Sequence, residues 1–191
     1  MKIPFFNSKK TERKTFEYLT QLLLLNDLNK LKKERENGTN FLLTDSYDGI
    51  NILEYYIKYL ENFTFDKREI VKFLIECNLD INHKGNTRTN ESSSLHLAAY
   101  ALDFELIKIL IELGAEIDIQ NKYGNTPLAE VVFNYRGESE IKKIISFLIE
   151  KGASLEKKNF HDVNTREHIL NVGGGIDAGF NKKEWDLRDL L

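Results

Sequence analysis

The chain has 191 residues, of which 41% are hydrophobic and 30% are charged, a composition typical of one folded domain rather than of a disordered chain. Its 27 basic and 30 acidic side chains leave a net charge of −3, which gives no electrostatic drive toward nucleic acid or anionic membrane surfaces. The single cysteine, Cys77, excludes an internal disulfide bond and a thiolate zinc cluster.

The cellular setting is predicted from similar features. The apolar stretch that follows Met1 is too short for the core of a secretion signal, and apolar runs such as Leu22–Leu25 are far too short to span a membrane. Lysine outnumbers arginine by 20 to 7, a bias that suits an AT-rich genome and favours a bacterial source. We therefore expect a cytoplasmic bacterial protein that does not bind membranes.

The first predicted elements are two helices that follow an N-terminal tail of residues 1–14. The chain from Thr15 onward has apolar residues at helical spacing, namely Phe16, Leu19, Leu22 and Leu23. The sequence Asn26-Asp27-Leu28 then predicts a turn between paired helices. The stretch Lys30–Glu36 is mostly charged, so we expect the second helix to leave one side in solvent.

Three later segments share one pattern, in which an apolar pair, one intervening residue and three apolar residues precede a glutamate. These segments are Ile70–Ile81, Leu106–Ile117 and Ile144–Leu155. Each predicts a short amphipathic helix that ends at a left-handed residue, and these residues are Asn78, Gly114 and Gly152, which lie 36 and 38 positions apart. Asp66 and Glu69 predict a capping box at the start of the first of these helices.

A second motif precedes each of these helices. It is found in the segments Gly49–Glu54, Ser93–Ala99 and Gly124–Ala129. In the last of them, Thr126 is suited to cap a helix whose first residue is Pro127, a position where the missing N–H of proline is harmless.

The two motifs together resemble ankyrin repeats, whose signature is Thr-Pro-Leu-His-x-Ala within a turn–helix–helix unit of about 33 residues. The segments Leu95–Ala99 and Thr126–Leu128 are the nearest matches. The resemblance implies an all-α solenoid that forms one domain over residues 15–191. We expect repeats at about 45–82, 83–120 and 121–158, between an N-terminal cap at 15–44 and a C-terminal cap at 159–191.

The sequence departs from the regular pattern at several places. Extra residues separate the two helices of the outer units, around 61–65 and 135–138, and the turn at 84–93 is elongated. Asp162 and Arg166 replace the glycine and the signature leucine of a further unit, so we expect the repeat register to decay there. Beyond that point we expect a helix at 167–171, a break at Gly173–Gly175 and a terminal lid at 184–191.

The residues that could carry catalysis do not form a recognisable site. The histidines are His83, His96, His161 and His168, and no two of them have the spacing of a helical zinc site. By the family resemblance His96 bonds to backbone in the turn region, and we interpret His83 and His161 as solvated turn residues. Cys77 is interpreted as a buried structural thiol, and Gly173–Gly175 lacks the lysine and hydroxyl of a phosphate loop. We therefore expect no enzyme activity, metal or cofactor.

The resemblance implies protein binding through the turn tips and the inward face of each first helix. The candidate tip residues are Tyr47, Asp48, His83, Lys84, Lys122, Tyr123, Phe160 and His161. The candidate first-helix residues are Tyr59, Tyr100 and Phe133, whereas Tyr56 is expected in the core. Aromatic rings at turn tips are open to two interpretations, contact with a partner or packing onto the next turn.

The predicted function is non-catalytic binding of another protein by a chain that is monomeric when alone. The chain resembles small ankyrin-type immunity proteins that neutralise bacterial toxins. If the toxin is a basic nuclease, the acidic residues Asp45, Asp48, Glu54 and Glu130 would attract it. The alternatives are a scaffold or effector that acts on a cellular or host protein, and an enzyme with a site near Gly173–Phe180.

Overall fold

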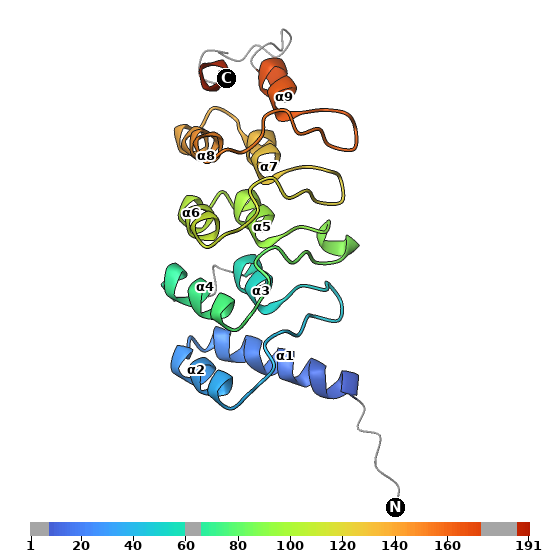
Figure 1. Cartoon of the computed structure of the whole chain (residues 1–191), viewed down its shortest axis with the longest axis vertical. Coiled ribbons are helices and arrows are strands. Elements are labelled where there is room, and N and C mark those ends of the chain that lie inside the picture. The colour runs from blue at the N-terminus through green and yellow to red at the C-terminus, as the bar shows by residue number, and fades with distance from the viewer. Residues whose placement is uncertain (1–7, 60–65, 173–186) are drawn as a thin grey trace, which may run out of the picture.

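A computed structural model describes residues 8–59, 66–172 and 187–191. The helices stack in two columns, with long turns projecting on the side away from the second column (Figure 1). The first column contains α1 (Ser8–Leu24), α3 (Ile52–Lys58), α5 (Ser94–Tyr100), α7 (Pro127–Asn134) and α9 (Thr165–Val172). The second contains α2 (Leu28–Glu36), α4 (Lys67–Glu76), α6 (Phe104–Glu112) and α8 (Ser139–Glu150). Short 3-10 helices occupy Thr87–Thr89 and Arg188–Leu190. The expected all-α architecture is confirmed over the described residues, whose only β features are three isolated bridges.

Most of the helices begin where a local side chain accepts from a free backbone N–H group, and α8 is an exception. Thr126 accepts a hydrogen bond from the backbone N–H of Ala129, and Pro127 is the first residue of α7, as expected. Ser93 caps α5 in the same way. Asp66 caps α4 by accepting from the N–H of Glu69, while the Glu69 carboxylate pairs with Lys32 on α2 at 3.0 Å. The predicted cap positions are thus confirmed, but the capping box predicted at Asp66 and Glu69 is only half formed, because the Glu69 carboxylate turns to Lys32.

The second helices end in left-handed residues, as the sequence predicts. The φ angles are 65° at Asn78, 96° at Gly114 and 93° at Gly152. A glycine or asparagine adopts this conformation at little cost, so the chain reverses after each helix and enters the next turn. The repeated cap residues therefore set the repeat length.

One apolar core runs through the whole stack between the two columns. Leu53, Leu74, Leu110 and Leu128 are fully buried along it. The predicted face of α1 is also buried, so the α1–α2 pair closes this end of the core. Helix α1 begins at Ser8, inside the segment expected to be a tail. No helix among the described residues is both long and apolar enough to cross a membrane.

The repeat pattern continues further toward the C-terminus than expected. Asp162 has a φ of 62°, close to the 77° of Gly124 in the preceding turn. Asn164 accepts a hydrogen bond from the N–H of Glu167, and Ile169 of α9 is fully buried. The expectation that the register decays here is therefore wrong for the turn and the first helix, because an aspartate adopts the left-handed conformation and Arg166 is tolerated at the column end.

The end of the chain returns to α8. Leu187 is buried in the core, and Asp189 pairs with Lys142 of α8 at 2.7 Å. The expected break at Gly173–Gly175 and most of the expected lid lie outside the described residues. The segment 187–191 thus contributes to the cover of the last second helix.

Ion pairs connect successive repeats along the second column. Their geometry joins α2 to α4 and α4 to α6, with both partners of most pairs partly exposed. Each exposed pair contributes at most about 1 kcal/mol. The pairs are Lys32–Glu69 at 3.0 Å, Arg35–Glu76 at 3.2 Å, Lys67–Asp103 at 2.6 Å and Arg68–Glu112 at 2.7 Å.

Candidate functional site

The turns that project from the stack are held by side-chain oxygens that accept backbone N–H groups. The Asp45 carboxylate accepts from Tyr47 at 2.8 Å and from Asp48 at 2.6 Å. Asn121 and Asn159 accept backbone N–H groups in the same way in the turns at 121–125 and 159–163. Asx turns of this kind place the following residue at the tip. The sequence therefore presents an outward residue at the same position of successive turns.

Backbone hydrogen bonds also join each turn to the next. The N–H of Asn86 donates to the carbonyl of Asp48 at 2.9 Å, that of Lys122 to Asn90 at 2.9 Å, and that of Phe160 to Tyr123 at 3.0 Å. These bonds lock neighbouring turns in register, so the tips form one continuous edge (Figure 1). A surface built from consecutive repeats is therefore positioned before any partner arrives.

Several aromatic rings on this edge and on the neighbouring first helices are exposed. Exposed fractions are 63% for Tyr47, 72% for Tyr100, 43% for Tyr123 and 71% for Phe160, whereas Tyr59 lies at 36%. By contrast Tyr56 is buried, as expected. Phe133 is half-buried, and its ring packs edge-on against that of His168, with 4.5 Å between the ring centroids. Phe133 therefore contributes to packing between α7 and α9.

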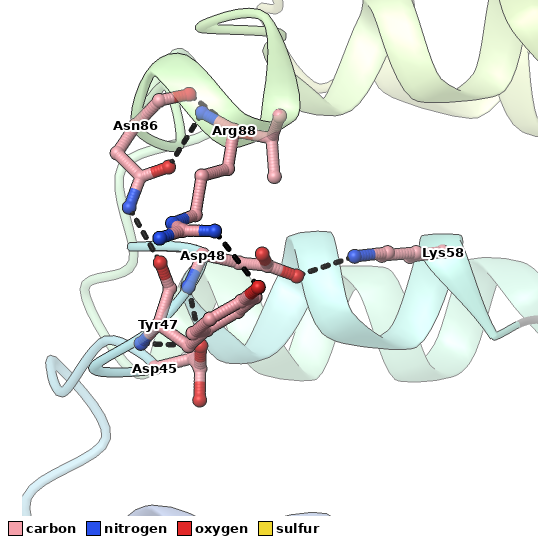
Figure 2. A network of polar contacts seen from close by, with 7 residues as sticks. Asp45, Tyr47, Asp48, Lys58, Asn86 and Arg88 are labelled. Carbon is pink, nitrogen blue, oxygen red and sulfur yellow. Dashed lines mark hydrogen bonds and ion pairs between the residues drawn. The ribbon is translucent and has the colours of Figure 1, made fainter.

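The elongated turn at 84–93 folds back onto the preceding tip (Figure 2). Asn86 donates from its side-chain amide to the carbonyl of Tyr47 at 2.7 Å. The Arg88 guanidinium lies over the Tyr47 ring, 4.1 Å from its centroid, and donates to the Tyr47 hydroxyl at 2.8 Å. Beside them Asp48 pairs with Lys58 of α3 at 2.5 Å. The extra residues of this turn therefore bring an arginine to the tip of the preceding repeat.

A groove of about 300 Å³ lies between the elongated turn and the first helices. Three consecutive turn–helix units contribute to it, so it exists only in the stacked protein. The residues that line it include Lys58, Arg88, Asn90, Tyr100, Asn121 and Glu130. Its lining combines an exposed aromatic ring with charged and amide groups, which is the usual chemistry of a protein-binding surface.

A buried acid–imidazole pair joins the first two units below the tips. His83 Nδ1 lies 2.7 Å from Glu54 Oε2, and Glu54 is fully buried in α3. This hydrogen bond raises the pKa of His83, burial opposes the rise, and the negative charges of Glu54 and Asp80 add to it. The interpretation of His83 as a solvated turn residue is therefore wrong, because the stacking of repeats leaves only 30% of its side chain exposed.

Comparison with known proteins agrees with this architecture. The family model for ankyrin repeats (3 copies) matches residues 60–159, about half of the chain. The chain belongs to the ankyrin-repeat family. Each of its ankyrin units consists of a turn, a first helix and a second helix, as described above.

The relatives of this ankyrin chain are much longer proteins with diverse names. It is 26% identical to alpha-latrotoxin-Lg1a of Latrodectus geometricus over 80% of the chain and 9% of that protein. It is 25% identical to Ankyrin repeat protein OPG189 of Variola virus over 83% of the chain and 24% of that protein. A putative palmitoyltransferase, ZDHHC13 of Danio rerio, is 38% identical over 31% of the chain and 9% of its own length. The chain thus spans at most about a quarter of these relatives.

The ankyrin signature histidine has the structural role expected from the resemblance. His96 Nε2 lies 2.9 Å from the carbonyl oxygen of Asn125 in the next turn. Burial lowers the pKa of His96 to about 4, the bond to that carbonyl opposes the change, and the charge of Lys84 adds to it. In the first repeat Glu54 occupies the signature position, and His83 from the following turn supplies the imidazole instead. A hydrogen bond between repeats is therefore retained, but here the first helix supplies the acceptor and the following turn supplies the imidazole.

We expect His83→Ala to lower the free energy of unfolding by about 1–3 kcal/mol, because it leaves the buried Glu54 carboxylate short of a donor. Since the folded pKa of His83 is raised, the stabilisation is fully present below about pH 6.5 and is lost as the pH rises through the folded value. Urea unfolding at about pH 6 and pH 9 measures both effects.

The control for this prediction is the same substitution in a Glu54→Gln background, which removes the buried charge. There the cost of His83→Ala should fall, and the pH dependence assigned to the pair should vanish. Equal costs in both backgrounds would show that the pair is not coupled.

The other candidate reactive groups are Cys77, His161 and His168. Cys77 is buried, and burial raises the pKa of its thiol to about 11, which agrees with a structural role. His161 is exposed at a tip, and burial together with the charge of Arg136 lowers the pKa of His168. Within residues 8–59, 66–172 and 187–191, no group of three histidine, cysteine, aspartate or glutamate side chains could hold a metal.

The acidic residues expected to attract a basic partner are engaged within the protein. Glu54 is buried, Asp45 accepts backbone N–H groups and Asp48 pairs with Lys58. Glu130 accepts from the side-chain amides of Asn121 and Asn125. The expectation of an acidic binding surface is therefore wrong for Glu54, which is buried, and for Asp48, whose charge Lys58 balances. The neutral donors at Asp45 and Glu130 leave the charges of these two residues in place.

Sequence reasoning missed Arg88, Asn86 and Lys58, which shape the groove. The available signal was the three-residue excess in the turn at 84–93, together with a rare arginine inside it. Of the predicted tip residues, the structure brings Tyr47 and Asp48 to one cluster with Arg88. Lys84, Lys122, Tyr123 and Phe160 lie on the turns that follow.

Proposed function

We propose that this ankyrin domain is a non-catalytic binding module that holds another protein against its turn tips and the adjoining first helices. The observation that carries the proposal is the row of exposed rings at Tyr47, Tyr100, Tyr123 and Phe160 across consecutive repeats. Aromatic side chains are enriched at binding hot spots, because they bury a large area at a small cost in conformational entropy.

The rigidity of the edge supports the same proposal. Hydrogen bonds between neighbouring turns fix the positions of the tips, and the guanidinium of Arg88 holds the Tyr47 ring. A preorganised surface loses little conformational entropy when it binds. We propose that the protein acts in the cytoplasm and is monomeric until it meets its partner.

Two finer roles use this surface in the same way. One is neutralisation of a toxin by an immunity protein, and the other is scaffolding of a cellular or host protein. Burial of Glu54 and the pairing of Asp48 with Lys58 leave only Asp45 and Glu130 to favour a basic nuclease as the target. The identity of the bound partner separates the two roles.

The experiment that tests the proposal compares two sets of variants in affinity capture and in direct binding. The tip variant carries Tyr47→Ala, Tyr123→Ala and Phe160→Ala. The control carries Leu24→Ala and Leu25→Ala at the end of α1, where both side chains are exposed away from the tips. A partner captured by the native protein is then purified, and its dissociation constant is measured by calorimetry.

We expect the tip variant to bind the purified partner at least about tenfold more weakly, because hot-spot rings contribute more than 1 kcal/mol each. The control should bind like the native protein. If the tip variant keeps native affinity while it remains folded by circular dichroism, the proposed surface is wrong.

A further inference from the structure

Arg88 carries an unbalanced positive charge at the edge of the groove. Its guanidinium donates to the neutral hydroxyl of Tyr47 and lies over the ring of the same residue. Among the described residues, no carboxylate lies within ion-pair distance of it. A guanidinium has five N–H donors in a planar fork, and this fork matches a carboxylate in two parallel hydrogen bonds.

The other charges in the groove are already balanced or engaged. Lys58 is paired with Asp48 at 2.5 Å, and the Glu130 carboxylate accepts from two asparagine amides. Neutral amides leave the negative charge of Glu130 in place, so Arg88 carries the unbalanced positive charge among the described residues that line the groove. Around it Thr89, Asn90 and Ser92 offer neutral polar groups, and Tyr100 offers an exposed ring.

The orientation of Arg88 is prepared by the elongated turn. Asn86 caps the short helix Thr87–Thr89 by accepting from the N–H of Arg88, and its amide holds the carbonyl of Tyr47 (Figure 2). The stacked guanidinium therefore loses less freedom on binding than a free side chain would. The elongated turn is therefore ordered and holds the guanidinium of Arg88 beside Tyr47.

Neighbouring turns add positive charge of a similar kind. Lys84 donates to the carbonyl of Gln120 at 3.2 Å, Lys122 to that of Thr87 at 2.9 Å, and Lys157 to that of Asp118 at 2.7 Å. A carbonyl orients an ammonium group without neutralising it. The three lysines line a hollow of about 550 Å³ that also contains Glu91 and Glu116. These two glutamates make the hollow mixed in charge, which disfavours a uniform polyanion such as nucleic acid.

We propose that Arg88 is the carboxylate receptor of the binding surface, and that the partner is a protein segment with an aspartate or glutamate side chain beside an apolar residue. The carboxylate pairs with the Arg88 fork, and the apolar residue covers Tyr100. This inference rests on the proposed function and names the chemistry of the partner. It reverses the sign of the charge first expected for this surface.

The test uses fluorescent peptides of about 12 residues built from the repeat Glu-Leu-Gly-Ser, with counterparts that carry Gln or Lys in place of Glu. Fluorescence anisotropy gives the dissociation constants for the native protein, Arg88→Gln, Arg88→Lys and Arg136→Gln. Arg136 is a matched control because it is exposed, donates to the backbone carbonyls of Phe133 and Tyr135, and lies outside the groove. A ¹⁵N spectrum follows the Nε–H resonance of Arg88, assigned by its absence in Arg88→Lys.

We expect the acidic peptide to bind at least about fivefold more tightly than the Gln peptide and to shift the Arg88 Nε–H resonance. Arg88→Gln should remove this preference, and Arg88→Lys should remove most of it because the fork is lost. Arg136→Gln should leave it unchanged.

Three results would overturn the inference. The first is equal affinity for the acidic and Gln peptides. The second is equal loss in Arg88→Gln and Arg136→Gln, which would indicate general charge attraction. The third is tighter binding of single-stranded DNA or of phosphatidylserine vesicles than of the acidic peptide, which would indicate a different class of partner. If the aromatic tip variant still loses the captured protein, the proposed function stands without this inference.

Discussion

We expect Leu110→Ala to lower the free energy of unfolding by about 2–5 kcal/mol, because the substitution removes transfer free energy and leaves a cavity in a closed core. Leu110 is fully buried in α6, and its helix packs against α4 and α5. The repeats on both sides limit how far the site can collapse. Equilibrium unfolding in urea gives the value directly.

The control for Leu110 is Leu25→Ala, which removes the same atoms from a side chain that is 70% exposed. We expect that variant to change the free energy of unfolding by less than about 0.5 kcal/mol. A cost below about 1 kcal/mol for Leu110→Ala would mean that the repeat register assigned to the second helices is incorrect.

The second large effect is a loss of stability in acid through His96. Its folded pKa of about 4 lies below the ordinary value of 6.5, because burial and the charge of Lys84 lower the pKa more than the bond to the carbonyl of Asn125 raises it. The unfolded chain therefore binds the proton more readily than the fold. Stability is complete above about pH 6.5 and falls by about 3 kcal/mol as the pH drops toward 4.

This effect is measured by comparing the native protein with His96→Gln in urea at about pH 7 and pH 4.5. The variant should be less stable at neutral pH, since it loses the bond to the next turn, but its further loss in acid should be smaller. Carboxylates shared by both proteins cancel in the difference. The same acid sensitivity in both proteins would contradict the assigned role of His96.

The parts of the fold predicted from sequence depend on local chemistry. A proline after a threonine starts α7, and an asparagine or glycine with a positive φ follows each of the apolar helices α4, α6 and α8. The nearly constant spacing of Asn78, Gly114 and Gly152 predicted the stack, since a helix that is apolar on a broad face must be covered by a neighbour. Such signals lie within a few residues of one another.

The parts that could not be predicted depend on contacts between successive turns. Glu54 and His83 are 29 positions apart, and Tyr47 and Arg88 are 41 positions apart. Nothing local shows that an acidic side chain in α3 is buried, so Glu54 was expected at the surface. Continuation of the pattern at Asp162 was missed because it relies on an aspartate in the conformation usually taken by glycine.

For the candidate site, sequence located the turn tips and their aromatic residues but not the charge that faces a partner. The net charge of this surface depends on which charged side chains are paired within the fold, as Asp48 is with Lys58. The structure leaves Arg88 as the unbalanced positive charge among the described residues that line the groove. The predicted residues Tyr47 and Tyr100 then become the apolar surroundings of a charged contact.

The proposed function requires that a partner protein covers the turn tips and the first helices. Hydrogen–deuterium exchange on the complex with the captured partner tests it most directly. We expect slower exchange in the peptides that contain the turns at 45–49, 84–93 and 121–125, with α4 and α6 unchanged on the opposite side of the stack. Protection confined to α4 and α6, with no change in these turns, would show that the partner does not bind at the turn tips.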